Sequence, residues 1–202
     1  FLRLSARLIA ERAAPVSFLA ALKHPLAAGG EAAQKFRASV RAVERAVLRG
    51  ARPDAGLNGM ARALDAAGET DGSAWLGPIA AAAAPFMELM AEKVTLAEVV
   101  AAHVGFAEWL AASDTQSGPE RLWAGEAGEA AAAFMAELAE SAAHAPALKG
   151  WEYPALFDAL MQGRVVRPRF GGHPRLFIWG PLEARLQRAD VMILGGLNEG
   201  SW

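Results

Sequence analysis

The sequence predicts a mainly α-helical protein, with a helical domain over residues 1–163 and a partial α/β segment over residues 164–202. Its composition favours helix, because 48 of the 202 residues are alanine and 53% are hydrophobic. In residues 1–163 apolar side chains recur three or four positions apart, which is the spacing of one helix face. After residue 164 the pattern changes to short, continuous apolar runs between Gly and Pro, which favour buried strands.

Three helices are predicted in the first fifty residues. The first spans residues 2–13, and Pro15 ends it and opens a second over residues 16–24. The third spans residues 31–49, where an apolar stripe at steps of four, three and four predicts the buried face. The stripe consists of Phe36, Val40, Val43 and Val47, and the remaining positions include Lys35, Arg37, Arg41, Arg45 and Arg49.

The middle of the chain alternates between predicted loops and helices. Residues 50–58 and 68–78 are rich in Gly, Asp and Pro, and they predict loops around a short helix over residues 59–67. Thr95 and Glu98 form a capping-box pattern at the start of a helix that runs to residue 112. The other predicted features are a helix over 79–93 interrupted at Pro85, a linker over 113–119, a second capping box at Ser117 and Glu120, and helices over 126–143 and 154–162. The last of these helices is expected to bury Leu156, Phe157 and Leu160.

Two apolar runs near the end of the chain predict about two parallel strands. They span Arg175–Trp179 and Asp190–Leu194, and Pro181–Arg188 between them is long enough for a short helix or crossover. Parallel strands are usually buried on both faces, so continuous apolar runs suit them. The chain begins at Phe1 and stops at Trp202 soon after an apolar run, which favours a piece of a longer protein.

Opposite charges are separated along the chain, although the formal net charge is only −2. Residues 1–52 carry a net charge of +7, residues 53–163 of −12 and residues 164–202 of +3. Such asymmetry suggests one part that faces a polyanion and another that faces solvent or protein. The alternative is that the helices simply carry solvated charged faces.

No motif in the sequence predicts a catalytic, metal or cofactor site. Without cysteine there is no disulfide, Cys-ligated metal or thiol nucleophile in these residues. The sequence contains no phosphate-binding G-x-x-x-x-G-K-[ST] motif and no G-x-G-x-x-G motif after a predicted strand. Residues 195–200 (GGLNEG) are more typical of a tight turn than of a phosphate loop. The four histidines are not spaced as metal ligands, and His103 is expected to be a partly buried structural residue. The six tryptophans are expected to anchor the hydrophobic core. The least polar stretch, residues 75–90, contains Gly, Pro and Glu and is a poor membrane span.

Residues 164–175 (RVVRPRFGGHPR) form the segment most suggestive of binding. Four arginines, a phenylalanine and a histidine lie in a stretch that Pro and Gly interrupt. Guanidinium groups match phosphate geometry and an aromatic ring can stack on a base, so the segment favours contact with DNA or phosphate. The alternative is a surface loop whose arginines pair with the acidic residues of 53–163.

Three stretches resemble the AddB subunits of bacterial helicase–nucleases that repair double-strand breaks, in their alphaproteobacterial form: PVSFLAALKHPLAAGG, LWAGEAGEAAAAF and the tail HPRLFIWGPLEARLQRADVMILGGLNEGSW. The resemblance implies an inactivated superfamily 1 helicase fold. Residues 1–163 would be the helical insertion domain of its second helicase half, and 164–202 part of a RecA-like domain. Where a nucleotide-sensing motif would stand, residues 180–186 read GPLEARL and do not match it. The resemblance therefore implies no active site in these residues, with the nuclease motif outside them.

The same resemblance implies partners and cofactors. The full complex would use ATP and Mg²⁺, contain an AddA-type helicase–nuclease subunit, act on DNA and lie in the bacterial cytoplasm with no membrane. The basic residues of 164–188 would lie near the DNA path or the subunit interface: Arg164, Arg167, Arg169, His173, Arg175, Arg185 and Arg188. The expected function is a DNA-guiding or subunit-docking scaffold in break repair and recombination. The alternative is a helical protein–protein interaction module with no direct DNA contact.

Overall fold

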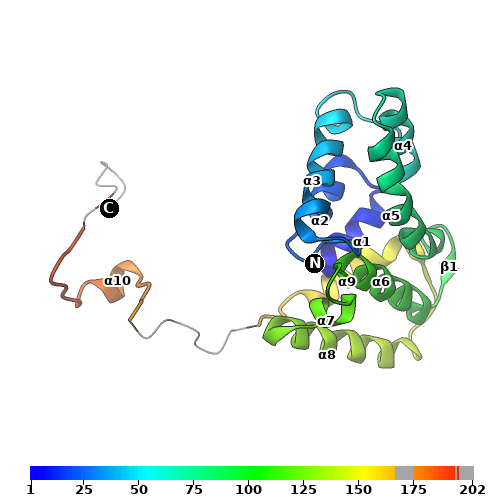
Figure 1. Ribbon diagram of the computed structural model, residues 1–202. Helices are drawn as coiled ribbons and strands as arrows, with labels where there is room; N and C mark the ends of the chain where they lie inside the picture. Colours follow the sequence, from blue (N-terminus) through cyan, green and yellow to red (C-terminus); the bar gives the residue numbers. More distant parts are fainter. Residues whose placement is uncertain (167–174, 194, 196–202) are drawn as a thin grey trace. The chain divides into compact units, whose positions relative to one another are not determined.

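The computed structural model describes residues 1–166, 175–193 and 195, and the chain divides into two compact units, Phe1–Val166 and Arg167–Trp202. Helices dominate the described residues, which confirms the predicted mainly α-helical class (Figure 1). The first unit contains α1 (Leu2–Ala10), α2 (Pro15–Leu22), α3 (Ala33–Val43), the π-helical turn η1 (Glu44–Leu48), α4 (Leu57–Ala66), α5 (Thr70–Leu89), α6 (Leu96–Ala111), α7 (Gly118–Leu122), α8 (Gly125–Ala142), the short 3₁₀ helix η2 (Gly150–Glu152) and α9 (Tyr153–Met161).

Helix α6 lies at the centre of the first unit. It packs against α1, α5, α7 and α8, while α4 packs on α5, and α1 contacts α2 and α9. Thr95 caps the start of α6 as predicted, because its hydroxyl accepts the Glu98 N–H while the Glu98 carboxylate accepts the Thr95 N–H. The largest fully buried side chains include Phe18, Phe36, Phe86, Phe106, Tyr153 and Phe157. One continuous aromatic and aliphatic core therefore holds the helices together.

Helix α5 contradicts the prediction of a loop over residues 68–78. It begins at Thr70 and continues through both Pro78 and Pro85 to Leu89. A proline inside a helix removes one backbone hydrogen bond, which is why the Gly- and Pro-rich sequence favours a loop. The helix forms nonetheless because its buried side chains recur at helical spacing, whereas both prolines lie on the exposed side. The buried residues of α5 are Leu76, Ile79, Ala83 and Phe86.

The sheet in the described residues differs from the predicted one. Strand β1 (Lys93–Val94) pairs antiparallel with β2 (Leu148–Lys149), so the sheet lies within the first unit. The backbone passes very close to Gly150 at this point, since a Cβ placed there would lie 1.8 Å from the Leu89 carbonyl oxygen. Only glycine fits this position, and the short ribbon joins the end of α5 to the start of η2.

The prediction of two parallel strands near the end of the chain is wrong for the residues that the structure describes. Residues 175–179 and 190–193 form no strand, and α10 (Pro181–Ala184) is the only regular element described between them. A strand needs a neighbouring strand to satisfy its N–H and C=O groups, and neither run has one among the described residues. Their apolar side chains are accordingly exposed, with Ile178 at 96% and Ile193 at 90%.

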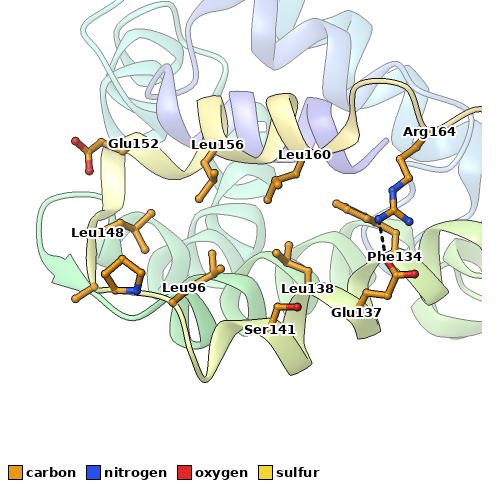
Figure 2. A pocket seen from close by; sticks show the side chains of 13 residues that line it. Leu96, Phe134, Glu137, Leu138, Ser141, Leu148, Glu152, Leu156, Leu160 and Arg164 are labelled. Carbon is orange, nitrogen blue, oxygen red and sulfur yellow. Dashed lines mark hydrogen bonds and ion pairs between the residues drawn. The ribbon is translucent and has the colours of Figure 1, made fainter.

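Helix α9 is also less buried than predicted. Phe157 is fully buried, but Leu156 and Leu160 are 36% and 41% exposed. Both leucines point from α9 toward α8 across an open groove (Figure 2). A helical stripe of apolar residues predicts which side chains share a face, but not whether another element covers that face.

The tryptophans are not uniformly the core anchors that were predicted. Trp75, Trp109 and Trp123 are partly buried against the core. Trp151 and Trp179 are 61% and 47% exposed, which contradicts the prediction for these two. Trp202 lies outside the described residues. Two of these indoles donate to partly buried carboxylates: Trp123 Nε1 to Glu108 at 2.7 Å and Trp75 Nε1 to Glu31 at 3.3 Å.

Candidate functional site

A row of arginines follows the exposed side of α3 and η1. Phe36, Val40 and Val43 turn inward and are fully buried, as the sequence predicts. Arg37, Arg41 and Arg45, hereafter the arginine strip, lie on the other side, with Arg37 partly exposed and the other two exposed. The local sequence thus folds as an amphipathic helix whose polar side is rich in cationic residues.

The arginine strip runs from α3 into the π-helical turn η1. Residues four positions apart on an α-helix are rotated by about 40° relative to one another, so a four-residue repeat drifts around the surface. A π-turn contains more residues per turn than an α-turn, so it offsets part of this drift. Because η1 begins at Glu44, directly before Arg45, the last arginine of the strip lies in this wider turn.

The single acidic residue of this helix is already neutralised. Glu44 Oε2 lies 2.6 Å from Lys23 Nζ, and Glu44 Oε1 lies 3.4 Å from Arg49 Nη2. The hydrogen bond from Lys23, with the nearby charges of Lys23 and Arg49, lowers the pKa of Glu44 below its ordinary value. Glu44 is therefore paired with Lys23 and Arg49, and its negative charge does not neutralise the arginine strip.

The arginine strip has no carboxylate partner among the residues that the structure describes. Other arginines of the first unit do: Arg3 Nε lies 2.6 Å from Asp158 Oδ1, Arg7 pairs with Glu11 at 3.0 Å and Arg62 with Asp54 at 3.1 Å. An uncompensated cationic row on a helix is a surface suited to a polyanion. Sequence reasoning placed these arginines on the polar face but did not select them as binding residues. Their four-residue spacing opposite the apolar stripe was the available signal.

The basic residues selected from the sequence divide between the two units. Arg164 belongs to the first unit and pairs with Glu137 at 2.7 Å, while its guanidinium lies 5.0 Å from the centre of the Phe134 ring. Arg175, Arg185 and Arg188 belong to the second unit, and all three are exposed. The remaining candidates, Arg167, Arg169 and His173, lie outside the described residues. The partner of Arg164, Glu137, is an acidic residue of 53–163.

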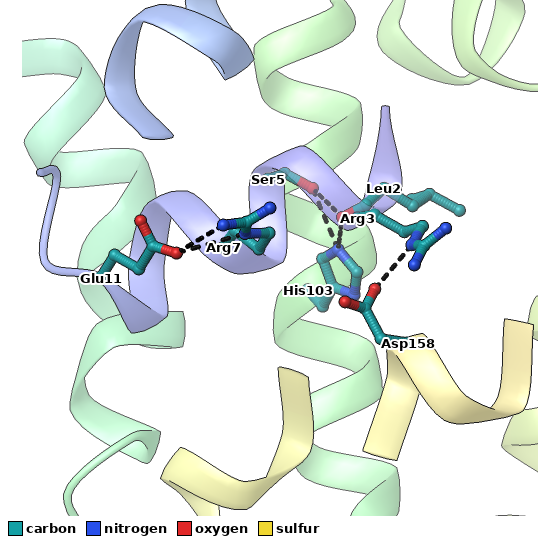
Figure 3. Close-up of polar contacts among 7 residues, drawn as sticks. All are labelled: Leu2, Arg3, Ser5, Arg7, Glu11, His103 and Asp158. Carbon is teal, nitrogen blue, oxygen red and sulfur yellow. Dashed lines mark hydrogen bonds and ion pairs between the residues drawn. The ribbon is translucent and has the colours of Figure 1, made fainter. Parts of the chain in front are cut away.

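A buried polar network around His103 has the appearance of a nucleophile–base pair (Figure 3). Ser5 Oγ lies 3.0 Å from His103 Nε2, and the Tyr153 hydroxyl lies 2.8 Å from His103 Nδ1. The Leu2 carbonyl oxygen accepts from Ser5 Oγ at 2.9 Å and lies 2.9 Å from His103 Nε2. Ser5, His103 and Tyr153 are all 0% exposed, so no substrate reaches them. The network therefore holds α1, α6 and α9 together, and His103 is more deeply buried than predicted.

Protonation of this network follows from its partners. A carbonyl oxygen only accepts, so His103 Nε2 carries the proton that faces Leu2. Nδ1 then accepts from the Tyr153 hydroxyl, whose pKa is raised by burial. Burial lowers the pKa of His103 to about 4, because a charged imidazolium would lose its hydration in the core.

The described residues contain neither a metal site nor a membrane-spanning helix. In the part of the chain that the structure describes, histidine and carboxylate side chains do not gather in groups of three that could hold a metal ion. None of the described helices combines the length and apolar character needed to cross a bilayer.

Comparisons of the chain with protein-family models, with curated proteins and with solved structures found no match.

Proposed function

We propose that this chain is a non-catalytic helical scaffold that guides a nucleic-acid strand, with the arginine strip as its phosphate contact. The observation that carries the proposal is the row formed by Arg37, Arg41 and Arg45 without carboxylate partners among the described residues. Each guanidinium presents several N–H donors in a planar fork, which suits phosphate oxygens.

The spacing of the strip supports contact with a strand and not with a single phosphate. Residues four positions apart on a helix are about 6 Å apart along its axis, so three guanidinium groups extend over about 12 Å. Such a row contacts the backbone and not the base edges, so binding is expected to be independent of base sequence.

The resemblance to AddB subunits identifies the proposed strand as DNA. On that basis residues 1–163 would be the helical insertion domain of a helicase half without an active motor, and 164–202 part of a RecA-like domain. Arg164, Arg167, Arg169, His173, Arg175, Arg185 and Arg188 would extend the DNA path or face an AddA-type subunit. ATP and Mg²⁺ would act elsewhere in the complex, in the bacterial cytoplasm. These assignments rest on the three resembling stretches alone.

A salt titration tests the proposal. A labelled single-stranded oligonucleotide is titrated with the full chain, by fluorescence anisotropy, between about 50 and about 200 mM KCl. Three phosphate contacts predict a slope of about −2 for log K against log [salt], hence about a 20-fold loss of affinity over this range. In the triple variant Arg37→Gln, Arg41→Gln, Arg45→Gln the slope should fall toward zero.

Arg7→Gln is the matched control, because Arg7 is an exposed arginine of α1 that already pairs with Glu11. It should retain the affinity and salt slope of the wild-type chain. Equal affinities and slopes for the wild type and the triple variant would contradict the proposal. The double variant Arg185→Gln, Arg188→Gln separately tests the residues of the second unit.

The second candidate function is a helical protein-interaction module without DNA contact. The pairing of Arg164 with Glu137 favours it, because this arginine is engaged by an acidic residue of the helical unit. Absence of DNA binding at about 50 mM KCl, in a chain that remains folded by circular dichroism, would favour this second function.

A further inference from the structure

An open apolar groove of about 620 Å³ lies between α8 and α9. Figure 2 shows Leu156 and Leu160 pointing into it from α9, with Leu138 on α8 and Leu96 across from them. Phe134 and Leu148 complete the apolar lining. Figure 1 shows α8 and α3 at different ends of the first unit, so the groove is separate from the arginine strip.

The apolar lining of the groove is continuous, and part of it remains exposed to solvent. Tyr153 and Phe157 of α9 are buried in the core. Leu156 and Leu160, four residues apart, form a second apolar side of the same helix. Contiguous apolar surface rimmed by polar residues is typical of an interaction site in a folded protein.

Polar groups stand at both ends of the groove. At one end Arg164 pairs with Glu137 at 2.7 Å and lies over the Phe134 ring. At the other end the Glu152 carboxylate accepts the Lys149 N–H at 3.0 Å, which holds its charge beside Leu148. Because Glu137 already neutralises Arg164, Glu152 leaves the lining with a net negative charge.

The wall formed by α8 adds to this negative charge. Its sequence, GEAGEAAAAFMAELAESA, contains no basic residue, and next to Glu137, which pairs with Arg164, it carries Glu140. Glu137 and Glu140 are exposed, and they border the turn of α8 that carries Leu138. An occupant with a carboxylate or phosphate head would be repelled, whereas cationic side chains flanking an apolar surface would be attracted.

We propose that the groove binds an amphipathic helix of a partner protein, with apolar anchors at i, i+3 or i+4, and i+7 and with Lys or Arg beside them. A helix suits a groove whose two long walls are helices and whose leucines lie four residues apart. Its apolar side chains fill the space between Leu138, Leu156 and Leu160. Its cationic side chains face Glu152 and Glu140.

The test uses the full chain and synthetic peptides of about 16 residues, long enough for four helical turns. The probe is a fluorescent Leu/Lys peptide with leucines at helical spacing. The two comparison peptides have the same composition in scrambled order, or Glu in place of every Lys. Anisotropy is read at about 150 mM salt, where charges more than about 8 Å apart are largely screened but contacting charges still interact. The probe should bind at least tenfold more tightly than either comparison peptide.

Variants locate the binding. The double variant Leu156→Gln, Leu160→Gln should weaken probe binding at least tenfold, and Glu152→Gln should weaken it several-fold. Val16→Gln is the matched control, because Val16 is an apolar residue of α2, 79% exposed and outside the groove. It should bind the probe as the wild type does, and circular dichroism checks that each variant is folded.

Three results would overturn the proposal. The first is equal binding of the scrambled or acidic peptide, and the second is unchanged probe binding by the leucine variant. The third is concentration-dependent self-association of the chain that the leucine variant abolishes, because a second copy would then be the occupant. Loss of DNA binding in the arginine-strip variant leaves this test unaffected, so the two proposals fail independently.

Discussion

Acidification should lower the free energy of unfolding of the first unit, because His103 is buried as a neutral ring. Burial lowers the pKa of His103 to about 4 in the folded chain, whereas an unfolded histidine titrates near 6.5. Between these two values the unfolded chain binds a proton that the folded chain does not. Stability is therefore fully present above about pH 6.5 and is lost as the pH falls toward 4.

The magnitude follows from the difference between the two pKa values. Linkage gives a loss in unfolding free energy of about 2 kcal/mol between pH 7 and pH 5, approaching 3 kcal/mol at pH 4. This is a large part of the total stability of a typical domain, which is about 5–15 kcal/mol. The physical cause is burial, because a charged imidazolium would lose its hydration in the core.

Urea unfolding at about pH 7 and about pH 5, followed by circular dichroism, measures the loss. His103→Gln removes the titrating ring but keeps an amide donor and acceptor, so it should lose about 2 kcal/mol less than the wild type over this interval. His144→Gln, at an exposed histidine, should behave as the wild type. Equal pH dependence of the wild type and His103→Gln would refute the reasoning. A titration midpoint of the wild-type His103 ring above about pH 5, measured by NMR, would also refute it.

Three further predictions concern local packing, each measured by the urea midpoint. Thr95→Ala removes the cap of α6 and should cost about 1 kcal/mol; an unchanged midpoint would show that the capping box is dispensable. Gly150→Ala should cost about 1–3 kcal/mol, because the added Cβ would clash with the Leu89 carbonyl oxygen. Gly77→Ala, at a helical position with open space around it, should stabilise the chain by about 0.5–1 kcal/mol. A change of the same sign in both variants would contradict the geometry. Pro85→Ala supplies the missing backbone N–H on the exposed side of α5 and should stabilise the chain by about 1–3 kcal/mol; a lower urea midpoint would contradict this expectation.

Helices with an apolar stripe and a recognisable start were predictable from sequence. In α3 the spacing of Phe36, Val40 and Val43 indicated the buried face, and in α6 the Thr95–Glu98 capping box marked the first turn. In α5 two signals conflicted, since the Gly and Pro content favoured a loop and the spacing of Leu76 and Ile79 favoured a helix. The burial of these side chains favoured the helix over the loop. Local sequence rules do not compare the free energy of that burial with the cost of a lost backbone hydrogen bond.

The candidate surfaces depend on tertiary context that the sequence does not contain. Leu156 and Phe157 are both apolar residues of α9, but only the packing of α1, α6 and α8 determines which one the core covers. Likewise, the charge count of residues 1–52 indicates an excess of cations without saying which ones pair. Glu44 is committed to Lys23 and Arg49 by the fold, and this leaves Arg37, Arg41 and Arg45 as the uncompensated row.

The network around His103 also sets an order for folding during synthesis. It joins Leu2 and Ser5 to His103 and Tyr153, which are separated by about a hundred and then by fifty positions. These contacts cannot form until α9 has left the ribosome, although α1 is made first. Until then the side of α1 that packs against α9 stays uncovered in the nascent chain.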